Sequence, residues 1–326
     1  MHEVRRHPDW DLAAVVENDP GVLAAATEDL AVPQPLRFRH LPDALAAAGP
    51  GADAVLVATA PDQHVVPCRE ALSARSAVLV EKPFTLELEE AVGLVEQAES
   101  AGQPLLVAQN YRYMRSHRTV RRVVEEGTLG RVGLVDAHYY RVPHDMTPSL
   151  ARLPHRVMWG MGVHHLDALR FVMGEPVVGV LAQSFDVPWT GDHDPVGGSL
   201  EVLLEFEGGA RATYGATYQS SGHEYFEAGQ EFYQRYLGER ATLHVFHRWV
   251  VLCESGKLPR WVRRGRRRTT EEAVLLQQLA DALRGGAEAE CSGRDNLQSV
   301  AVSAACLRSS ERREWVNPQE LLHQAQ

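Results

Sequence analysis

The chain has 326 residues, of which 44% are hydrophobic and 23% are charged, and its formal net charge is −10. This length exceeds that of a usual single domain, so two domains are expected. The acidic balance argues against nucleic acid as the main partner, and no apolar run approaches the roughly 20 residues that span a bilayer. With no signal-peptide pattern and four scattered cysteines, the sequence predicts a cytoplasmic protein with reduced thiols and no membrane partner.

Short apolar runs alternate with helix-like segments from Leu12 to about Ala108. This alternation predicts a parallel sheet with helices on both faces, which binds ligands at the carboxyl ends of its strands. We expect strands at 12–17, 53–61, 77–83 and 104–110, and helices at 20–30, 41–47, 64–74 and 86–102.

The pattern changes after Asn110. Turn signals such as Glu207-Gly208-Gly209 separate apolar runs, which predicts hairpins and a largely antiparallel sheet. We expect strands at 131–142, 177–185, 198–206, 210–219 and 241–247, and helices at 116–130, 270–284 and 295–308. The fold class is therefore α/β: a Rossmann-like domain over residues 1–108, followed by an α+β domain with an open sheet over 109–326, with a cleft between them.

The first predicted strand ends in Glu17, as the second strand of a dinucleotide-binding unit does. Residues 1–10 then correspond to the end of the preceding helix. No GxGxxG occurs anywhere in the sequence, so the first strand and the turn that binds the pyrophosphate are missing. A gap in a sheet leaves backbone groups unpaired. We expect the flanking strands to close up, another chain to fill the gap, or the true start to lie upstream of Met1.

A lysine follows the predicted strand at 77–83. The tripeptide Glu81-Lys82-Pro83 places its ammonium at the carboxyl edge of the sheet, where ligands bind. Alone, such a lysine is more often a solvated strand end. Its sequence context changes that interpretation.

Four segments occur in a fixed order along the chain: VATAPDQHVVPCREAL, VLVEKPFTLELEEAVGLVEQAE, LLVAQNYRYMRSHRTVRRVVEEGTLGRVGLV and GVHHLDALRFVMGE. Together they resemble the Gfo/Idh/MocA oxidoreductases, the family of glucose-fructose oxidoreductase and inositol dehydrogenase. The resemblance implies oxidation or reduction of a sugar, cyclitol or related small molecule with NAD or NADP. It also implies a homo-oligomer formed through the C-terminal sheet.

The resemblance also implies roles for individual residues. Lys82 lies beside the nicotinamide and hydrogen-bonds the reacting hydroxyl, where a cation favours the developing alkoxide. Glu17 at the ribose favours NAD over NADP. The other implied cofactor contacts are Thr59, Pro61, His64, Glu81 and Pro83, and the implied substrate contacts at the domain junction are Asn110 and Arg112.

The second catalytic segment matches the family pattern D-x-G-x-H-x-x-D. His164 is the implied general base, and Asp167, the final aspartate of the pattern, is an implied substrate contact. The first aspartate of the pattern is replaced by Gly160, so His164 acts alone or borrows a carboxylate such as Asp145. Its neighbour His165 is a further substrate-side candidate. Alternatively, one of these two histidines is a hydrogen-bonded core residue and the other is exposed; no metal site is expected.

Two departures from the family keep a second function open. Because the glycine-rich turn is missing, we expect weak or absent NAD binding, and Gly160 lacks the catalytic carboxylate of the family. The main hypothesis is an NAD(P)-dependent oxidoreductase that moves hydride to or from a hydroxyl or keto carbon. The alternative is a degenerate member with non-redox acid–base chemistry (lyase, epimerase or cyclase), or a non-catalytic binding subunit. Substrate specificity is expected in the loops 186–196 and 220–230.

Overall fold

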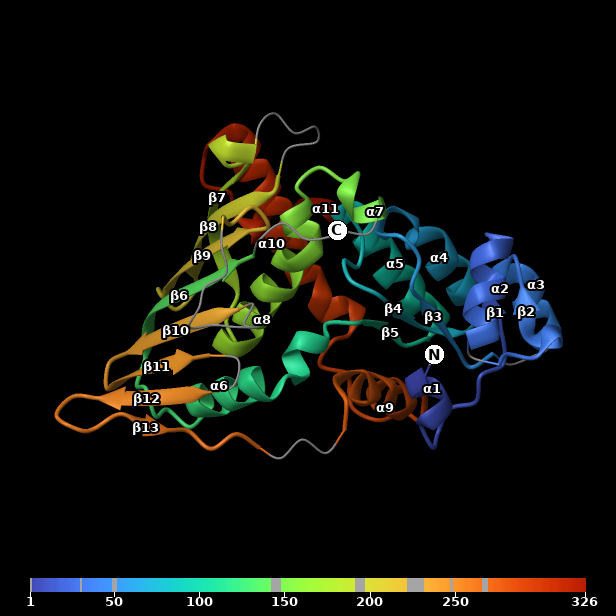
Figure 1. The fold of residues 1–326 in the computed structure, drawn as a ribbon, viewed down its shortest axis with the longest axis horizontal. Helices are drawn as coiled ribbons and strands as arrows, with labels where there is room; N and C mark the ends of the chain where they lie inside the picture. The colour runs from blue at the N-terminus through green and yellow to red at the C-terminus, as the bar shows by residue number, and fades with distance from the viewer. Residues whose placement is uncertain are drawn as a thin grey trace. The chain divides into compact units, whose positions relative to one another are not determined.

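The computed structural model describes residues 2–29, 31–48, 52–141, 148–190, 197–221, 232–246, 249–265 and 269–326. The chain divides into two compact units, whose elements are drawn in Figure 1. The first unit comprises Met1–Ala108 and Thr269–Asn296, and the second comprises Gln109–Arg268 and Leu297–Gln326. The sequence analysis assigns Thr269–Asn296 to the second domain, whereas in the structure it belongs to the first unit.

The first unit contains two parallel sheets, one with strand order β1-β2 and one with strand order β3-β4-β5. The predicted strand at 12–17 is reduced to two residues, and β2 is a strand that the sequence analysis does not predict. The elements of this unit are α1 (His2–Arg6), β1 (Val15–Val16), α2 (Pro20–Asp29), η1 (Gln34–Leu36), β2 (Arg37–Phe38), α3 (Leu41–Ala48), β3 (Ala54–Val57), η2 (Pro61–Gln63), α4 (Val65–Ser73), β4 (Ala77–Val80), α5 (Leu88–Ala101), β5 (Leu105–Val107), α9 (Glu271–Leu283) and the start of α10 (Gly293–Arg312).

The tetrapeptide Ala-Val-Leu-Val occurs in both β3 and β4, and the two copies have different surroundings. All four residues of β4 are buried, because β4 lies between β3 and β5. Among the described strands, β3 pairs on one side only, and its Leu56 is 42% exposed, whereas the aligned Leu79 of β4 is 7% exposed. No pairing joins β1 to β3 in the described part of the chain, so the expectation that the flanking strands close up is wrong.

The segment that follows residue 268 contacts the N-terminal residues of the chain, which belong to the first unit. The hydroxyl of Thr270 caps α9 by accepting a hydrogen bond from the Ala273 amide, and it donates to Glu3 at 3.0 Å. The indole of Trp10 donates to the Leu276 carbonyl at 3.0 Å. These contacts explain why α9 belongs with the first unit although it is far away in sequence.

The second unit is built on an eight-stranded sheet of order β13-β12-β11-β10-β6-β9-β8-β7, in which only the β6–β9 pair is parallel. The predicted hairpin at 207–209 joins β8 to β9, and β10, β12, β13 and α11 are elements that the sequence analysis does not predict. The elements of this unit are η3 (Asn110–Tyr113), α6 (Arg115–Glu125), β6 (Val132–Tyr140), α7 (Pro148–Ala151), a π-helical turn (Met158–Gly162), α8 (Val163–Met173), β7 (Val177–Phe185), η5 (Pro188–Thr190), β8 (Ser199–Phe206), β9 (Arg211–Thr217), β10 (Tyr233–Gly238), β11 (Ala241–Val245), β12 (Val250–Glu254), β13 (Arg260–Trp261), the rest of α10 and α11 (Pro318–Ala325).

Helices cover one face of this sheet. On β6, Val135, Ala137 and Tyr139 are buried, while Leu134 and Tyr140 on the other face are 55% and 39% exposed. Figure 1 shows α6, α8 and α10 on the covered side. The alternation along β6 is therefore that of a sheet with one covered and one open face, and both units agree with the predicted α/β class.

In the described part of the chain, no helix combines the length and the apolar character that crossing a membrane requires. All four cysteines have free thiols, and three of them are buried.

Candidate active site

Lys82 follows β4 at the carboxyl end of the β3-β4-β5 sheet. The residue is half-buried, and burial lowers the pKa of its ammonium, while the neighbouring Glu81 carboxylate raises it. Glu81 itself is exposed and accepts a hydrogen bond from the Lys82 amide at 3.3 Å. A lysine with a lowered pKa is a stronger acid than a free lysine, and it places a cation where ligands bind in such sheets.

His64 occupies a different place from the one that the sequence suggests. The sequence analysis places it along the cofactor, but its ring is fully buried. Its Nδ1 lies 2.8 Å from the Pro83 carbonyl oxygen and its Nε2 lies 3.2 Å from the Thr59 carbonyl oxygen. His64 therefore ties the loop after β3 to the residue that follows Lys82, and it has no surface with which to contact a ligand.

Three other residues of the first unit fit a dinucleotide. Glu17 is half-buried at the end of β1 and accepts a hydrogen bond from the Asp19 amide at 2.9 Å, which leaves its second oxygen available to a ribose diol. Thr59 is exposed on the loop after β3, and Pro61 follows it at the start of η2. These positions fit the ribose and nicotinamide parts of NAD.

The diphosphate part of NAD has a poorer fit. The chain contains no GxGxxG turn. The N-terminus of α2 is already capped, because Asp19 Oδ1 accepts hydrogen bonds from the amides of Gly21 and Val22 at 2.8 and 2.9 Å. A carboxylate in this position repels a phosphate. The predicted cofactor contacts therefore concern the ribose and nicotinamide parts of NAD, and the sequence offers no glycine-rich turn for its diphosphate.

Arg112 and Asp167 face each other in the core of the second unit instead of facing a substrate. Both are buried, and they form a bidentate ion pair with distances of 2.5 and 2.7 Å. Ser299 on α10 also donates to Asp167, at 2.6 Å. The sequence analysis expects these two residues to contact substrate, whereas in the structure they bind each other and have a structural role. A buried carboxylate needs such partners. The pair fastens η3 to α8.

His164, the expected general base, lies in the first turn of α8 and is 6% exposed. The ring of Tyr111 on η3 stacks on it, with centroids 4.4 Å apart and an interplanar angle of 12°. Asn110, the other expected residue of this turn, is half-buried beside Tyr111. The stack restrains the imidazole plane. Tyr111 is a site residue that the sequence analysis misses, since nothing in a single sequence pairs positions 111 and 164.

His165 is a core residue. It is fully buried, its Nδ1 lies 2.7 Å from the Tyr214 hydroxyl, and its ring stacks on Phe232 at 3.9 Å. It therefore cannot contact substrate, contrary to the expectation. The alternative in the sequence analysis is that one of the two histidines is a hydrogen-bonded core residue and the other is exposed. His165 is that core residue, but His164 is also buried, so the second half of the alternative is wrong.

Gly160 lies one helical turn before His164, within the π-helical turn. A Cβ at this position would overlap the hydroxyl of Tyr218, and it would lie 3.1 Å from Leu150 Cδ2. The space that a side chain would need is therefore occupied by a buried phenol. This packing explains the glycine in place of the family aspartate. Asp145, the expected substitute carboxylate, lies outside the described residues.

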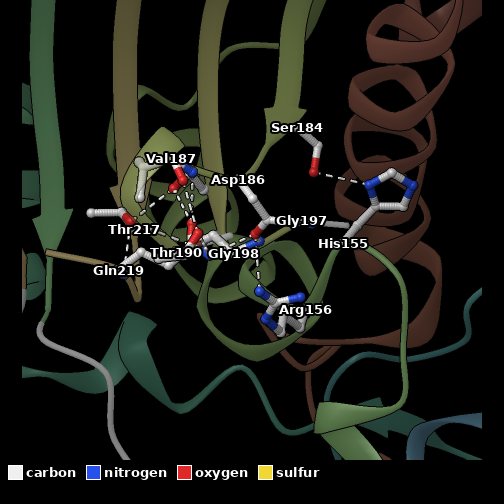
Figure 2. A network of polar contacts seen from close by, with 11 residues as sticks. His155, Arg156, Ser184, Asp186, Val187, Thr190, Gly197, Gly198, Thr217 and Gln219 are labelled. Atoms are coloured by element: carbon white, nitrogen blue, oxygen red, sulfur yellow. Dashed lines mark hydrogen bonds and ion pairs between the residues drawn. The ribbon is translucent and has the colours of Figure 1, made fainter. Parts of the chain in front are cut away.

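A buried polar network fixes the start of one expected specificity loop (Figure 2). The carboxylate of Asp186 accepts hydrogen bonds from Arg156, from the Gly198 amide and from Gln219, at 2.9, 2.8 and 2.6 Å. Gln219 in turn accepts a hydrogen bond from the Val187 amide at 3.2 Å. Residues 186–190 are thus anchored to the ends of β8 and β9, and the remainder of both expected loops is largely outside the described residues.

The whole chain has relatives among known proteins. It is 26% identical over 324 residues to D-apiose dehydrogenase of Rhizobium rhizogenes, covering 95% of this chain and 91% of the relative. It is 26% identical over 325 residues to inositol 2-dehydrogenase of Rhizobium meliloti, covering 94% and 91%. These identities extend over both units.

Solved structures share the fold. An Agrobacterium radiobacter oxidoreductase, crystallised with NAD+, L-tartaric acid and magnesium, has a TM-score of 0.85 at 22% identity, with coverage of 99% of this chain and 95% of that chain. An inositol dehydrogenase homologue from Azotobacter vinelandii, crystallised with NADH and myo-inositol, has a TM-score of 0.82 at 20% identity, with coverage of 94% and 90%.

Two family profiles match the sequence. Residues 1–109 match the oxidoreductase family with an NAD-binding Rossmann fold, and residues 117–258 match the GFO/IDH/MocA C-terminal domain. Together these matches cover most of the chain, and they confirm the resemblance on which the sequence analysis relies. The chain belongs to the Gfo/Idh/MocA family of oxidoreductases.

Proposed function

We propose that this protein is an NAD-dependent dehydrogenase or reductase acting on a hydroxyl or keto carbon of a sugar or cyclitol. Membership of an NAD-binding oxidoreductase family carries the proposal. The relatives that align over the whole chain are named apiose and inositol dehydrogenases, and neighbours in fold were crystallised with NAD+ or NADH. The comparisons do not favour the non-redox alternative.

Lys82 and His164 are the proposed catalytic groups. NAD, when bound, would supply the transfer of hydride to or from the substrate carbon. In the oxidation direction, the Lys82 ammonium hydrogen-bonds the substrate oxygen and stabilises the charge that develops on it. The lowered pKa of Lys82 makes its ammonium a stronger hydrogen-bond donor to the substrate oxygen. His164 takes the hydroxyl proton, and the Tyr111 ring restrains the imidazole plane.

NAD binding can be tested before any substrate is known. Titration of the purified chain with NADH and NADPH, followed by quenching of tryptophan fluorescence, should show binding of NADH in preference to NADPH, because Glu17 repels a 2′-phosphate. Weak affinity is expected from the missing glycine-rich turn. Absence of binding up to millimolar NADH would contradict the redox function.

Turnover tests the rest of the proposal. The purified chain is incubated with NAD and with myo-inositol, D-apiose or other polyols and aldoses, and NADH formation is followed by absorbance. A Lys82→Met variant keeps a side chain of similar length without the charge, so it should lose turnover while retaining NADH binding. Full activity in this variant would refute the assignment of Lys82.

We further propose a homo-oligomer that forms through the open face of the eight-stranded sheet, and a cytoplasmic location. Exposed apolar side chains on that face, including Leu134 and Tyr140, support the first proposal. Free thiols at all four cysteines agree with a reducing compartment. Light scattering should show that Leu134→Glu shifts the protein towards the monomer; an unchanged mass would place the interface elsewhere.

A further inference from the structure

A chain of buried hydrogen bonds runs from the sheet of the second unit to the turn that carries Tyr111. The Tyr236 hydroxyl donates to Gln234 Oε1 at 2.5 Å, and Gln234 Nε2 lies 2.8 Å from His117 Nε2. His117 Nδ1 then lies 2.8 Å from the Tyr111 carbonyl oxygen. Gln234 and Tyr236 are neighbours on the covered side of β10, and His117 is on α6.

These contacts are consistent with a single arrangement of protons. The Gln234 carbonyl oxygen accepts from Tyr236, so its amide nitrogen donates to His117 Nε2. His117 must then carry its proton on Nδ1 and donate it to the Tyr111 carbonyl. Burial lowers the pKa of His117 to about 4, so the imidazole is neutral at neutral pH, as this arrangement requires.

The chain of hydrogen bonds ends at the residue that stacks on the proposed catalytic base. Its last acceptor is the backbone of Tyr111, and the ring of Tyr111 stacks on His164 at 4.4 Å. On the other side of the same turn, Arg112 is held by Asp167 of α8. The turn is therefore fixed at two successive residues, by one tie to α6 and by one to α8.

We propose that Tyr111 is a positioning residue for His164, and that the chain Tyr236–Gln234–His117 holds Tyr111 in place. The proposal rests on the function proposed above. A ring lying face to face with the imidazole restricts rotation of that imidazole out of its plane, so the ring nitrogen remains aimed in one direction between turnovers. Such preorganisation matters because small misplacements of a reacting group are costly in rate.

Two variants of His117 separate this role from a structural one. In His117→Asn the amide nitrogen lies close to the position of Nδ1, so the bond to the Tyr111 carbonyl is kept and the bond from Gln234 is lost. In His117→Gln the amide oxygen reaches towards the position of Nε2, so the bond from Gln234 is kept and the bond to Tyr111 is lost. Each variant loses the imidazole ring and one hydrogen bond, which makes the two a matched pair.

The expected result is a difference in kcat and not in stability. His117→Gln should lower kcat by about 10-fold relative to His117→Asn, within the range that a small misplacement costs, with little change in KM. The melting temperatures of the two variants should be similar. Equal values of kcat in the two variants would overturn the proposal, since a structural role would affect both alike.

A spectroscopic readout needs no substrate. Stacking on Tyr111 shifts the His164 ring protons upfield, and their NMR signals can be assigned by their loss in His164→Gln. The upfield shift should persist in His117→Asn and decrease in His117→Gln. If the two variants show this pattern but the wild type turns over no polyol, the positioning role stands and the proposed function fails. If the His164 signals are the same in both variants, the positioning role itself is refuted.

Discussion

Replacing Gly160 with alanine should destabilise the second unit, and removing the Tyr218 hydroxyl should relieve most of that cost. The added Cβ would overlap the hydroxyl, with Leu150 Cδ2 at 3.1 Å and Tyr218 Cζ at 3.3 Å. Overpacking of a buried position costs about 1–3 kcal/mol, and alanine in place of glycine within a helix returns about 0.5–1 kcal/mol. The net loss for Gly160→Ala therefore spans about 0–2.5 kcal/mol, and the severe overlap with the Tyr218 hydroxyl places it in the upper part of that range, at about 1.5–2.5 kcal/mol.

The Tyr218→Phe background removes the overlapping atom and leaves only neighbours beyond 3 Å. In that background, Gly160→Ala should change the free energy of unfolding by less than about 0.5 kcal/mol, so the coupling between the two substitutions is at least about 1 kcal/mol. Urea unfolding of the wild type, the two single variants and the double variant measures this coupling. Additive effects within about 0.5 kcal/mol would refute the packing argument.

Three further predictions concern buried groups. Arg112→Met and Asp167→Leu should each cost about 3–5 kcal/mol because each removes one partner of a buried bidentate ion pair, whereas the double variant should cost less than the sum; urea unfolding measures all three. His117 should contribute a loss of about 3 kcal/mol of stability as the pH falls from 6.5 towards 4, because the unfolded chain binds a proton that folded His117, with a pKa of about 4, does not; the same titration of His117→Gln should show a total loss smaller by about that amount. His64→Leu should reduce kcat more than His64→Asn, because the asparagine retains a donor near the Nδ1 position and hence the hydrogen bond to the Pro83 carbonyl next to Lys82. Steady-state kinetics measures both variants, and equal losses would show that His64 does not position Lys82.

The elements that the sequence predicts well are those whose burial follows a simple period. β7 begins and ends at the predicted residues, and α5 ends at the predicted Gly102, which adopts a φ of 64°. β10 is missed because its covered face carries the polar Gln234. That amide is tolerated in the core only because Tyr236 and His117 satisfy it, and these partners are identified by the fold rather than by the local pattern.

The site shows a similar division. The position of Lys82 at the end of a buried strand follows from strand and proline signals, so the sequence predicts it. The pairing of Arg112 with Asp167 joins residues 55 positions apart, and burial turns two expected substrate ligands into an internal ion pair. Which polar residue faces a ligand and which faces another polar residue depends on packing, and a single sequence does not contain that information.

The segment that carries the family motif shows how packing assigns these roles. Gly160, His164 and Asp167 are spaced by four and three residues, so they lie near one face of their helix. Each meets a different side chain: Tyr218 fills the space at Gly160, and Tyr111 and Arg112 of η3 stack on His164 and pair with Asp167, respectively. Asp167 is fully engaged and position 160 has no side chain, so in the proposed mechanism His164 is the motif position that remains for proton transfer. If one imidazole carries this role without the family aspartate, the restraint that Tyr111 imposes on it becomes correspondingly important.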